Sequence, residues 1–197
     1  MRSRPFAVVL ATGLAWAVPA SAGTIQQTIQ FPGVAPQAIY DAYISSRGHA
    51  DMTGAPATWY RPSTKTDVPV GQEGDDLHAF GVKGQDGKLK YLLGGKILRL
   101  VPGREIVMSW RPAAWDEQRK PGADLECILV LTLKKTSAGS ELQLVQVDIP
   151  DYVDEDETDK TTGEVTTETS AVNTHWYFRY WAPMQKYFQA QASRDAR

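Results

Sequence analysis

The stretch that decides the fold lies near the end of the chain and reads Trp176-Tyr177-Phe178-Arg179-Tyr180-Trp181-Ala182-Pro183-Met184-Gln185-Lys186-Tyr187-Phe188. It holds seven aromatic residues and one proline in thirteen positions. Trp176, Tyr180 and Met184 recur at the i, i+4, i+8 spacing that places side chains on one face of a helix, and Tyr187 and Phe188 continue it. Aromatic side chains bury about 150–250 Å² each, so this helix must lie against a large apolar surface.

The residues before this helix supply that surface as a series of predicted strands. Polar and apolar residues alternate from Thr24 to Phe31, which predicts a first strand. Two short helices follow over 36–44 and 45–52, the first opened by Pro36 and the second ended by Gly54. Further strands are expected over 57–61, 76–83, 88–100, 105–111, 124–134 and 141–149, with a bulge or bend at Gly94-Gly95. This order predicts an α+β fold in which a curved antiparallel sheet wraps around a long C-terminal helix.

The first 22 residues have the pattern of a secretory signal peptide. Arg2 and Arg4 precede an apolar run from Phe6 to Val18, and Pro19-Ala20-Ser21-Ala22 offers a small-residue cleavage site. The alternative is an uncleaved anchor, although the run is short for a membrane span. We therefore expect residues 23–197 to form a single mature domain that is periplasmic or secreted. No later segment is apolar enough to predict stable membrane insertion.

Charge and cysteine content narrow the classes of partner. The chain has a formal net charge of −2 and no cluster of lysine and arginine, which argues against nucleic acid. The single cysteine, Cys127, alternates with leucines on one strand face and is expected to be a small core residue. The acidic run from Asp151 to Asp159 lacks the spaced ligands of a calcium loop, so a solvated loop is the favoured reading.

Three segments in order resemble a known family. They are Thr53-Gly54-Ala55-Pro56-Ala57 after a short helix that carries His49, the stretch Leu100 to Arg111, and the closing aromatic helix. Together they resemble the activator of heat-shock-protein-90 ATPase homologues, of the START-like or SRPBCC superfamily. The resemblance covers roughly Ile29 to Phe188 and implies a helix-grip fold with an apolar cavity between sheet and helix. It also implies that a proline at position 183 is tolerated.

Two features depart from that family. The connection from Asp151 to Thr169 is longer and more acidic than usual, and the chain carries an export signal. The eukaryotic co-chaperone role in this family needs a cytosolic partner that uses ATP, which an exported protein would not meet.

No catalytic constellation, metal site or cofactor motif stands out. The three histidines, His49, His78 and His175, are far apart in the sequence and lack metal-ligand spacing, so structural or surface roles are favoured for each. A small hydrophobic molecule is the expected partner, with no cofactor and no identified protein partner. The predicted lining of its cavity is Phe80, Tyr91, Trp110, Leu129, Gln146, Trp176, Tyr180 and Met184.

Two strand positions leave alternatives open. Leu142 and Leu144 share parity with Gln146, so either a bulge swaps the faces near Leu144 or Gln146 projects inward as a polar anchor. His78 shares strand parity with Phe80, which would place both on one face.

The sequence is therefore compatible with three alternative functions. The first is a non-catalytic START-like carrier of a small hydrophobic ligand. The second is a cyclase- or hydrolase-type enzyme that uses the same cavity, with His78 as the acid–base group. The third is a chaperone-assisting interaction module. A sealed interior would favour the third, and a cavity with a buried histidine or carboxylate would favour the second.

Overall fold

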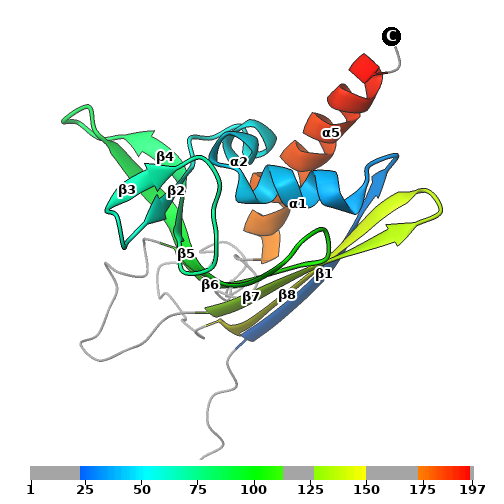
Figure 1. Ribbon diagram of the computed structural model, residues 1–197, viewed down its shortest axis with the longest axis horizontal. Coiled ribbons are helices and arrows are strands. Elements are labelled where there is room, and N and C mark those ends of the chain that lie inside the picture. The colour runs from blue at the N-terminus through cyan, green and yellow to red at the C-terminus, as the bar shows by residue number, and fades with distance from the viewer. Residues whose placement is uncertain (1–22, 113–126, 150–172, 196–197) are drawn as a thin grey trace, which may run out of the picture.

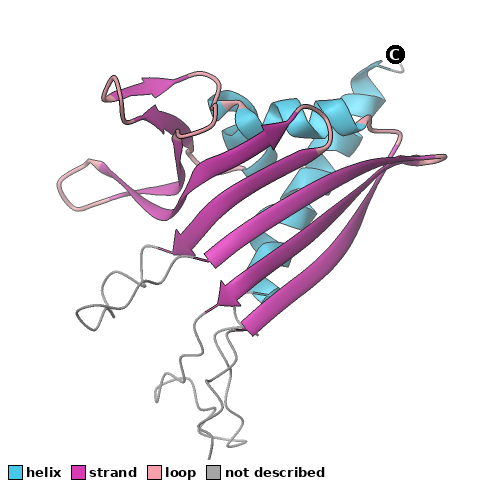
Figure 2. Ribbon diagram, turned by 60° about the horizontal axis from the view of Figure 1, so that its bottom comes forward, coloured by secondary structure: helices cyan, strands magenta, loops and turns pink. Residues whose placement is uncertain are grey.

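The computed structural model describes residues 23–112, 127–149 and 173–195. Its strands form one antiparallel sheet in the order β1-β8-β7-β6-β5-β4-β2-β3. The strands are β1 (Gly23–Pro32), β2 (Thr58–Arg61), β3 (Thr66–Val68), β4 (Asp76–Lys83), β5 (Leu89–Val101), β6 (Glu105–Pro112), β7 (Cys127–Thr136) and β8 (Gly139–Ile149). The sheet curves, and the helices lie on its concave face (Figures 1 and 2). The predicted α+β, helix-grip architecture is confirmed.

The helices begin and end where the sequence indicates. Helix α1 (Pro36–Ile44) has proline at its first position, and α2 (Ser46–Thr53) is capped by the Ser45 side chain, which accepts from the Gly48 N–H at 3.1 Å. Gly54 ends α2 in the left-handed conformation that favours glycine. The final helix consists of a turn at 173–176, the π-helical turn η2 (Tyr177–Trp181) and α5 (Ala182–Asp195).

The long strand β5 is irregular close to the predicted place. Gly94 and Gly95 pair regularly with β4, and the register shift instead falls between Ile97 and Arg99 on the β6 side. The two glycines serve close strand approach, because a Cβ at Gly95 would lie 2.0 Å from the Ser109 carbonyl oxygen. Glycine at this position therefore lets β5 and β6 meet where the sheet curves.

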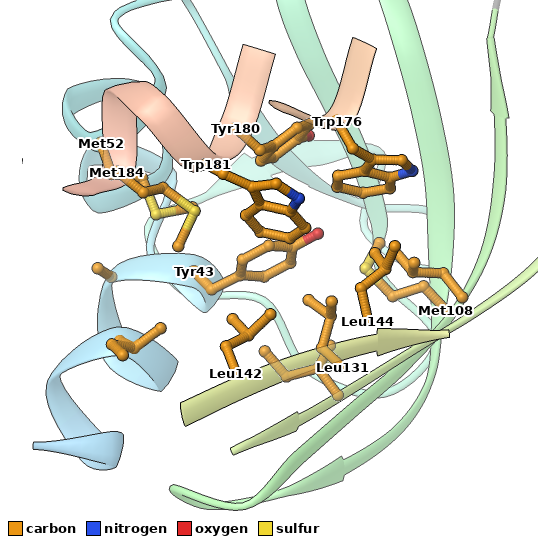
Figure 3. Packing of buried hydrophobic residues seen from close by; sticks show 14 of the residues in the cluster. Tyr43, Met52, Met108, Leu131, Leu142, Leu144, Trp176, Tyr180, Trp181 and Met184 are labelled. Carbon is orange, nitrogen blue, oxygen red and sulfur yellow. The ribbon is translucent and has the colours of Figure 1, made fainter. Parts of the chain in front are cut away.

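The core lies between the concave face of the sheet and the helices (Figure 3). Leu131, Leu142 and Leu144 point upward from β7 and β8 toward Trp176 and Trp181 of the final helix. All five side chains are at most 3% exposed. Burial of this apolar area is the main force that holds the final helix on the sheet.

Candidate functional site

The final helix buries one side and exposes the other. Trp176, Tyr180, Trp181, Met184 and Phe188 are 0–4% exposed. Tyr177 and Phe178, on the opposite side, are 54% and 66% exposed. The predicted aromatic face is therefore the buried face, and it is wider than the i, i+4 pattern alone indicates because Trp181 belongs to it.

The π-helical turn explains how Tyr180 and Trp181, which are neighbours in sequence, are both buried. Its hydrogen bond runs from the Ala182 N–H to the Tyr177 carbonyl, five residues back. In an α-helix, residues five apart point about 140° away from each other. The wider turn instead brings Trp176 over Trp181, and their rings stack at 5.2 Å with an interplanar angle of 16°.

Pro183 is the second residue of α5 and is separated from this turn by Ala182 alone. Proline has no N–H to donate to the carbonyl four residues back, and its ring clashes with that carbonyl in a regular α-helix. The preceding π-helical turn changes the local register from four residues to five, so the helix continues as α5 through the proline. The implied tolerance of a proline here therefore has a structural reason.

The buried aromatic rings form one continuous cluster. Trp110 of β6 lies 5.4 Å from Trp176 and 6.0 Å from Tyr180 between ring centroids. Tyr180 in turn lies 4.6 Å from Trp176. Three of the predicted lining residues, Trp110, Trp176 and Tyr180, thus contact one another in the interior. Such offset and edge-to-face pairs add about 0.5–1.5 kcal/mol each beyond area burial.

Gln146 projects into this interior. Leu142, Leu144 and Gln146 are all buried at alternate positions of β8, so no face swap occurs near Leu144. The swap comes later, at Asp148, which has φ 60° and is exposed, while Ile149 is buried again. The polar-anchor alternative for the position of Gln146 therefore agrees with the structure.

The amide of Gln146 is only half satisfied. Its Oε1 accepts a hydrogen bond from the Trp176 indole N–H at 2.7 Å. Its Nε2 has no hydrogen-bond partner among the described residues, although the side chain is 0% exposed. Leu129, fully buried, is its direct neighbour across the β7–β8 ladder. A buried donor without an acceptor costs about 1–3 kcal/mol, so this N–H is a candidate contact for a bound molecule.

A second polar group lies under the final helix. His49 of α2 is 0% exposed, and its Nδ1 lies 3.0 Å from the Tyr43 carbonyl oxygen. A carbonyl only accepts, so Nδ1 carries the proton and the Tyr180 hydroxyl donates to Nε2 at 3.3 Å. Burial lowers the pKa of His49 to about 4, and the imidazole is therefore neutral at pH 7.

Tyr43 completes this group. Its ring lies 4.8 Å from His49 and 6.4 Å from Tyr180, and its hydroxyl is buried with no partner among the described residues. Figure 3 shows the hydroxyl pointing between Trp181 above and the leucines of the sheet below. Burial raises the pKa of Tyr43 and that of Tyr180, so both keep their protons.

Phe80 reaches the same interior through an unusual backbone. It has φ 56°, and Ala79 and Phe80 are consecutive buried residues in β4. Its ring packs edge-to-face against Tyr180, with the ring centroids 5.3 Å apart. The guanidinium carbon of Arg179, which belongs to η2, lies 5.4 Å from the centroid of the Phe80 ring. A positive φ is rare for a bulky residue, so the surrounding contacts must compensate for the strain.

This irregularity overturns the expectation that His78 shares a face with Phe80. His78 lies between the buried Leu77 and Ala79, on the outer face of the sheet. It stacks there between Tyr60 at 5.6 Å and Tyr91 at 5.4 Å. Tyr91 is half-buried, and its ring contacts His78 rather than the aromatic cluster. Two residues proposed from strand parity are thus placed away from the other candidates.

The remaining predicted lining residue, Met184, is fully buried beside Met52 of α2 (Figure 3). Met52, Tyr43, His49 and Trp59 are interior residues that sequence reasoning did not place in the candidate site. Tyr43 and Met52 lie on the apolar sides of the predicted helices, which was the available signal. The apolar sides of these helices did not predict that α1 and α2 pack under the final helix.

Charged groups are scarce in this interior. The buried carboxylate of Asp75 lies at the β2–β4 side of the sheet, where Arg61 holds both of its oxygens at 2.8 and 3.0 Å. Within residues 23–112, 127–149 and 173–195, no three metal-ligating side chains gather to hold an ion. No helix in the same part of the chain has the length and apolar character to cross a membrane. The geometry therefore provides apolar walls and neutral hydrogen-bonding groups.

Comparison with known proteins identifies relatives of this architecture. Residues 34–179 match the sequence profile of the family described as Activator of Hsp90 ATPase homolog 1-like protein. No curated protein matches the chain. A Cytophaga hutchinsonii protein is 15% identical, with a TM-score of 0.57 and coverage of 88% of this chain and 98% of its own. A Chromobacterium violaceum protein is 20% identical, with a TM-score of 0.52 and coverage of 85% and 95%.

Proposed function

Because the chain belongs to the Activator of Hsp90 ATPase homolog 1-like family, we propose that it is an exported, non-catalytic START-like module that holds a small hydrophobic molecule between the sheet and the final helix. The bound molecule carries at least one oxygen atom that accepts a hydrogen bond. The mature domain begins near Gly23 and acts in the periplasm or outside the cell.

The observation that carries this proposal is the half-satisfied amide of Gln146. The Trp176 N–H fixes Oε1 and thereby aims Nε2 in one direction. A carbonyl or hydroxyl oxygen of a ligand would accept from Nε2 and offset the desolvation cost of the buried donor. The Tyr43 hydroxyl, also buried and unpartnered among the described residues, would recognise a second polar atom.

The aromatic cluster supports an apolar ligand body. Rings from β4, β6 and the final helix surround the same interior, and ligand sites are lined mainly by apolar and aromatic groups with a few placed polar atoms. Phe80, Trp110, Leu129 and Met184 would supply these walls. Tyr91 would act only at the periphery, because its ring contacts His78.

The protonation states support binding without catalysis. His49 is neutral, and its Nε2 already accepts from Tyr180. A general base needs a free lone pair within reach of a substrate proton. His78 faces outward, so it does not provide the acid–base group that an enzyme using the proposed cavity would need.

A displacement assay tests the proposal at Gln146. Nile red would be displaced by 2-octanone or by n-octane, which differ by one hydrogen-bond acceptor. We expect Gln146→Met to weaken the binding of 2-octanone about tenfold, because one hydrogen bond is lost. The same variant should leave the affinity for n-octane unchanged. The matched control is Gln143→Met, three residues away on the outward side of β8.

A second variant tests the space itself. Leu129→Trp should fill the interior beside Gln146 and weaken both probes while circular dichroism shows an intact fold. Equal loss of both probes in Gln146→Met and Gln143→Met would contradict a polar anchor. Binding of Nile red no better than to a tightly packed control protein would contradict the ligand-binding function.

One observation favours the chaperone-assisting module as the second candidate. Tyr177 and Phe178 are exposed on the outer side of the final helix and lie 5.3 Å apart. Exposed aromatic side chains are enriched at protein interfaces. Tyr177→Ser together with Phe178→Ser should abolish capture of a partner under this function and leave Nile red binding unchanged.

A further inference from the structure

A separate pocket opens at the end of β7, away from the aromatic cluster. It has a volume of about 500 Å³. Its lining includes the charged residues Arg99, Arg104, Glu105, Lys134 and Lys135, together with Pro36 and Gly103. The walls come from the β5–β6 turn, the end of β7 and the start of α1. None of the candidate ligand-binding residues described above lines it.

The pocket is strongly basic although the chain is acidic overall. Four cationic side chains and one carboxylate line it, which gives a formal charge of +3, whereas the whole chain carries −2. The carboxylate of Glu105 lies 3.3 Å from Arg99 Nε. Arg104, Lys134 and Lys135 make no ion pair with a carboxylate of the described residues. Three positive charges are therefore available to a ligand.

Two carboxylates near the pocket accept hydrogen bonds from groups that do not line it. Glu141 stands opposite Lys134 in the β7–β8 ladder, but its carboxylate accepts from Gln30 Nε2 at 2.8 Å. Glu73 accepts from the Leu100 N–H at 2.8 Å. Neither of these carboxylates lines the pocket.

The N-terminus of α1 adds to the positive electrostatic potential of the pocket. Pro36, the first residue of this helix, is one wall of the pocket. No side chain caps this end, and its first turn holds no acidic residue. The partial positive charge of a helix N-terminus favours anions within about one turn.

Gly103 of the β5–β6 turn lies close to the Gln37 side chain of α1. It has φ +64°, and a Cβ there would lie 2.5 Å from Gln37 Oε1. The Leu133 N–H donates to the Arg104 carbonyl at 2.7 Å, which ties the same turn to β7. This hydrogen bond fixes the backbone at Arg104 relative to β7.

We infer that this pocket binds the phosphate group of a small phosphate monoester or of a lipid headgroup. Guanidinium and ammonium groups from separate segments surround a phosphate well, and arginine donates to two of its oxygens at once. The volume accommodates a phosphorylated small molecule. A doubly charged phosphate fits three unpaired cations better than a monocarboxylate does. This site is independent of the apolar interior.

Calorimetric titration at low ionic strength tests the site with glycerol 2-phosphate, and with glycerol as the uncharged reference. We expect glycerol 2-phosphate to bind, glycerol not to bind, and the affinity to fall as salt is added. Arg104→Gln with Lys135→Gln should weaken binding at least about tenfold, while Lys83→Gln with Lys186→Gln, outside the pocket and with the same charge change, should alter it less than about twofold.

Vesicles separate the two sources of phosphate. Flotation with phosphatidylcholine vesicles that contain phosphatidic acid, and loss of flotation in the pocket variant alone, would assign the lipid headgroup. Binding of glycerol 2-phosphate without flotation would assign a soluble monoester. Equal weakening in the two double variants, or no binding of either probe by the wild-type protein, would overturn the site.

Discussion

The indole N–H of Trp176 donates to the side-chain oxygen of Gln146 at 2.7 Å and so joins the final helix to β8 inside a fully buried environment. This hydrogen bond sets which atom of the Gln146 amide, Oε1, faces Trp176. It also leaves the amide N–H₂ group as the polar feature that distinguishes the interior from a wholly apolar core.

The buried face of the final helix should dominate stability. We expect Trp176→Ala and Trp181→Ala each to lower the free energy of unfolding by about 3–5 kcal/mol, since each removes a large core side chain. Phe178→Ala, at a site 66% exposed, should change it by less than about 1 kcal/mol. Urea titrations of the three variants provide the comparison. Losses below about 1 kcal/mol in both tryptophan variants would show that the helix does not dock as described.

His49 should make stability depend on pH. Its pKa is lowered from 6.5 to about 4, so the unfolded chain binds the proton more readily than the folded one. Stability should therefore be full above about pH 6.5 and fall by about 3 kcal/mol as the pH drops toward 4.

His49→Asn isolates this effect from the titration of carboxylates. The slope of unfolding free energy against pH between about 6.5 and 4 should be smaller in this variant than in wild type. His175→Asn, at an exposed position, should keep the wild-type slope. Identical slopes in all three proteins would rule out a buried neutral His49.

Gly95 should not tolerate a side chain. A Cβ there would lie 2.0 Å from the Ser109 carbonyl oxygen, so Gly95→Ala must push β5 and β6 apart. We expect a loss of about 1–3 kcal/mol in thermal or urea unfolding. Gly94→Ala, whose nearest contact would be 3.1 Å, should cost less. The reverse order of the two losses would contradict the described register.

The mature protein should lack the signal peptide. N-terminal sequencing of the exported form is expected to begin at or near Gly23, because the basic start, apolar run and small-residue site occur in the required order. An intact Met1 on protein recovered from the periplasm would contradict cleavage.

The sequence predicted the helices and every strand of the fold except the short edge strand β3, and it did not predict the local irregularities that shape the interior. Alternation and helix caps located the strands and helices, and the spacing from Trp176 to Met184 identified the buried helix face. The positive φ of Phe80 could not be predicted from strand parity, so His78 was assigned to the wrong face. The π-helical turn likewise follows from packing and Pro183 together, and only it explains why Trp181 stacks on Trp176.

The burial of His49 was the second feature that could not be predicted from the sequence. His49 is buried because α1 and α2 fold under the final helix, and that arrangement brings it to Tyr180, 131 positions later in the chain. Such long-range contacts leave no periodic signal in the sequence. Gln146 differed, because its parity with Leu142 and Leu144 made an inward position one of the two alternatives that the sequence left open.

Native mass spectrometry of protein purified from the periplasm tests the central function most directly. The ligand-binding account predicts a second mass above that of the free protein, from an apolar molecule with an oxygen acceptor, and a reduced share of this species in Gln146→Met but not in Gln143→Met. A single mass equal to the free protein in all three preparations, with no uptake of added 2-octanone, would contradict it.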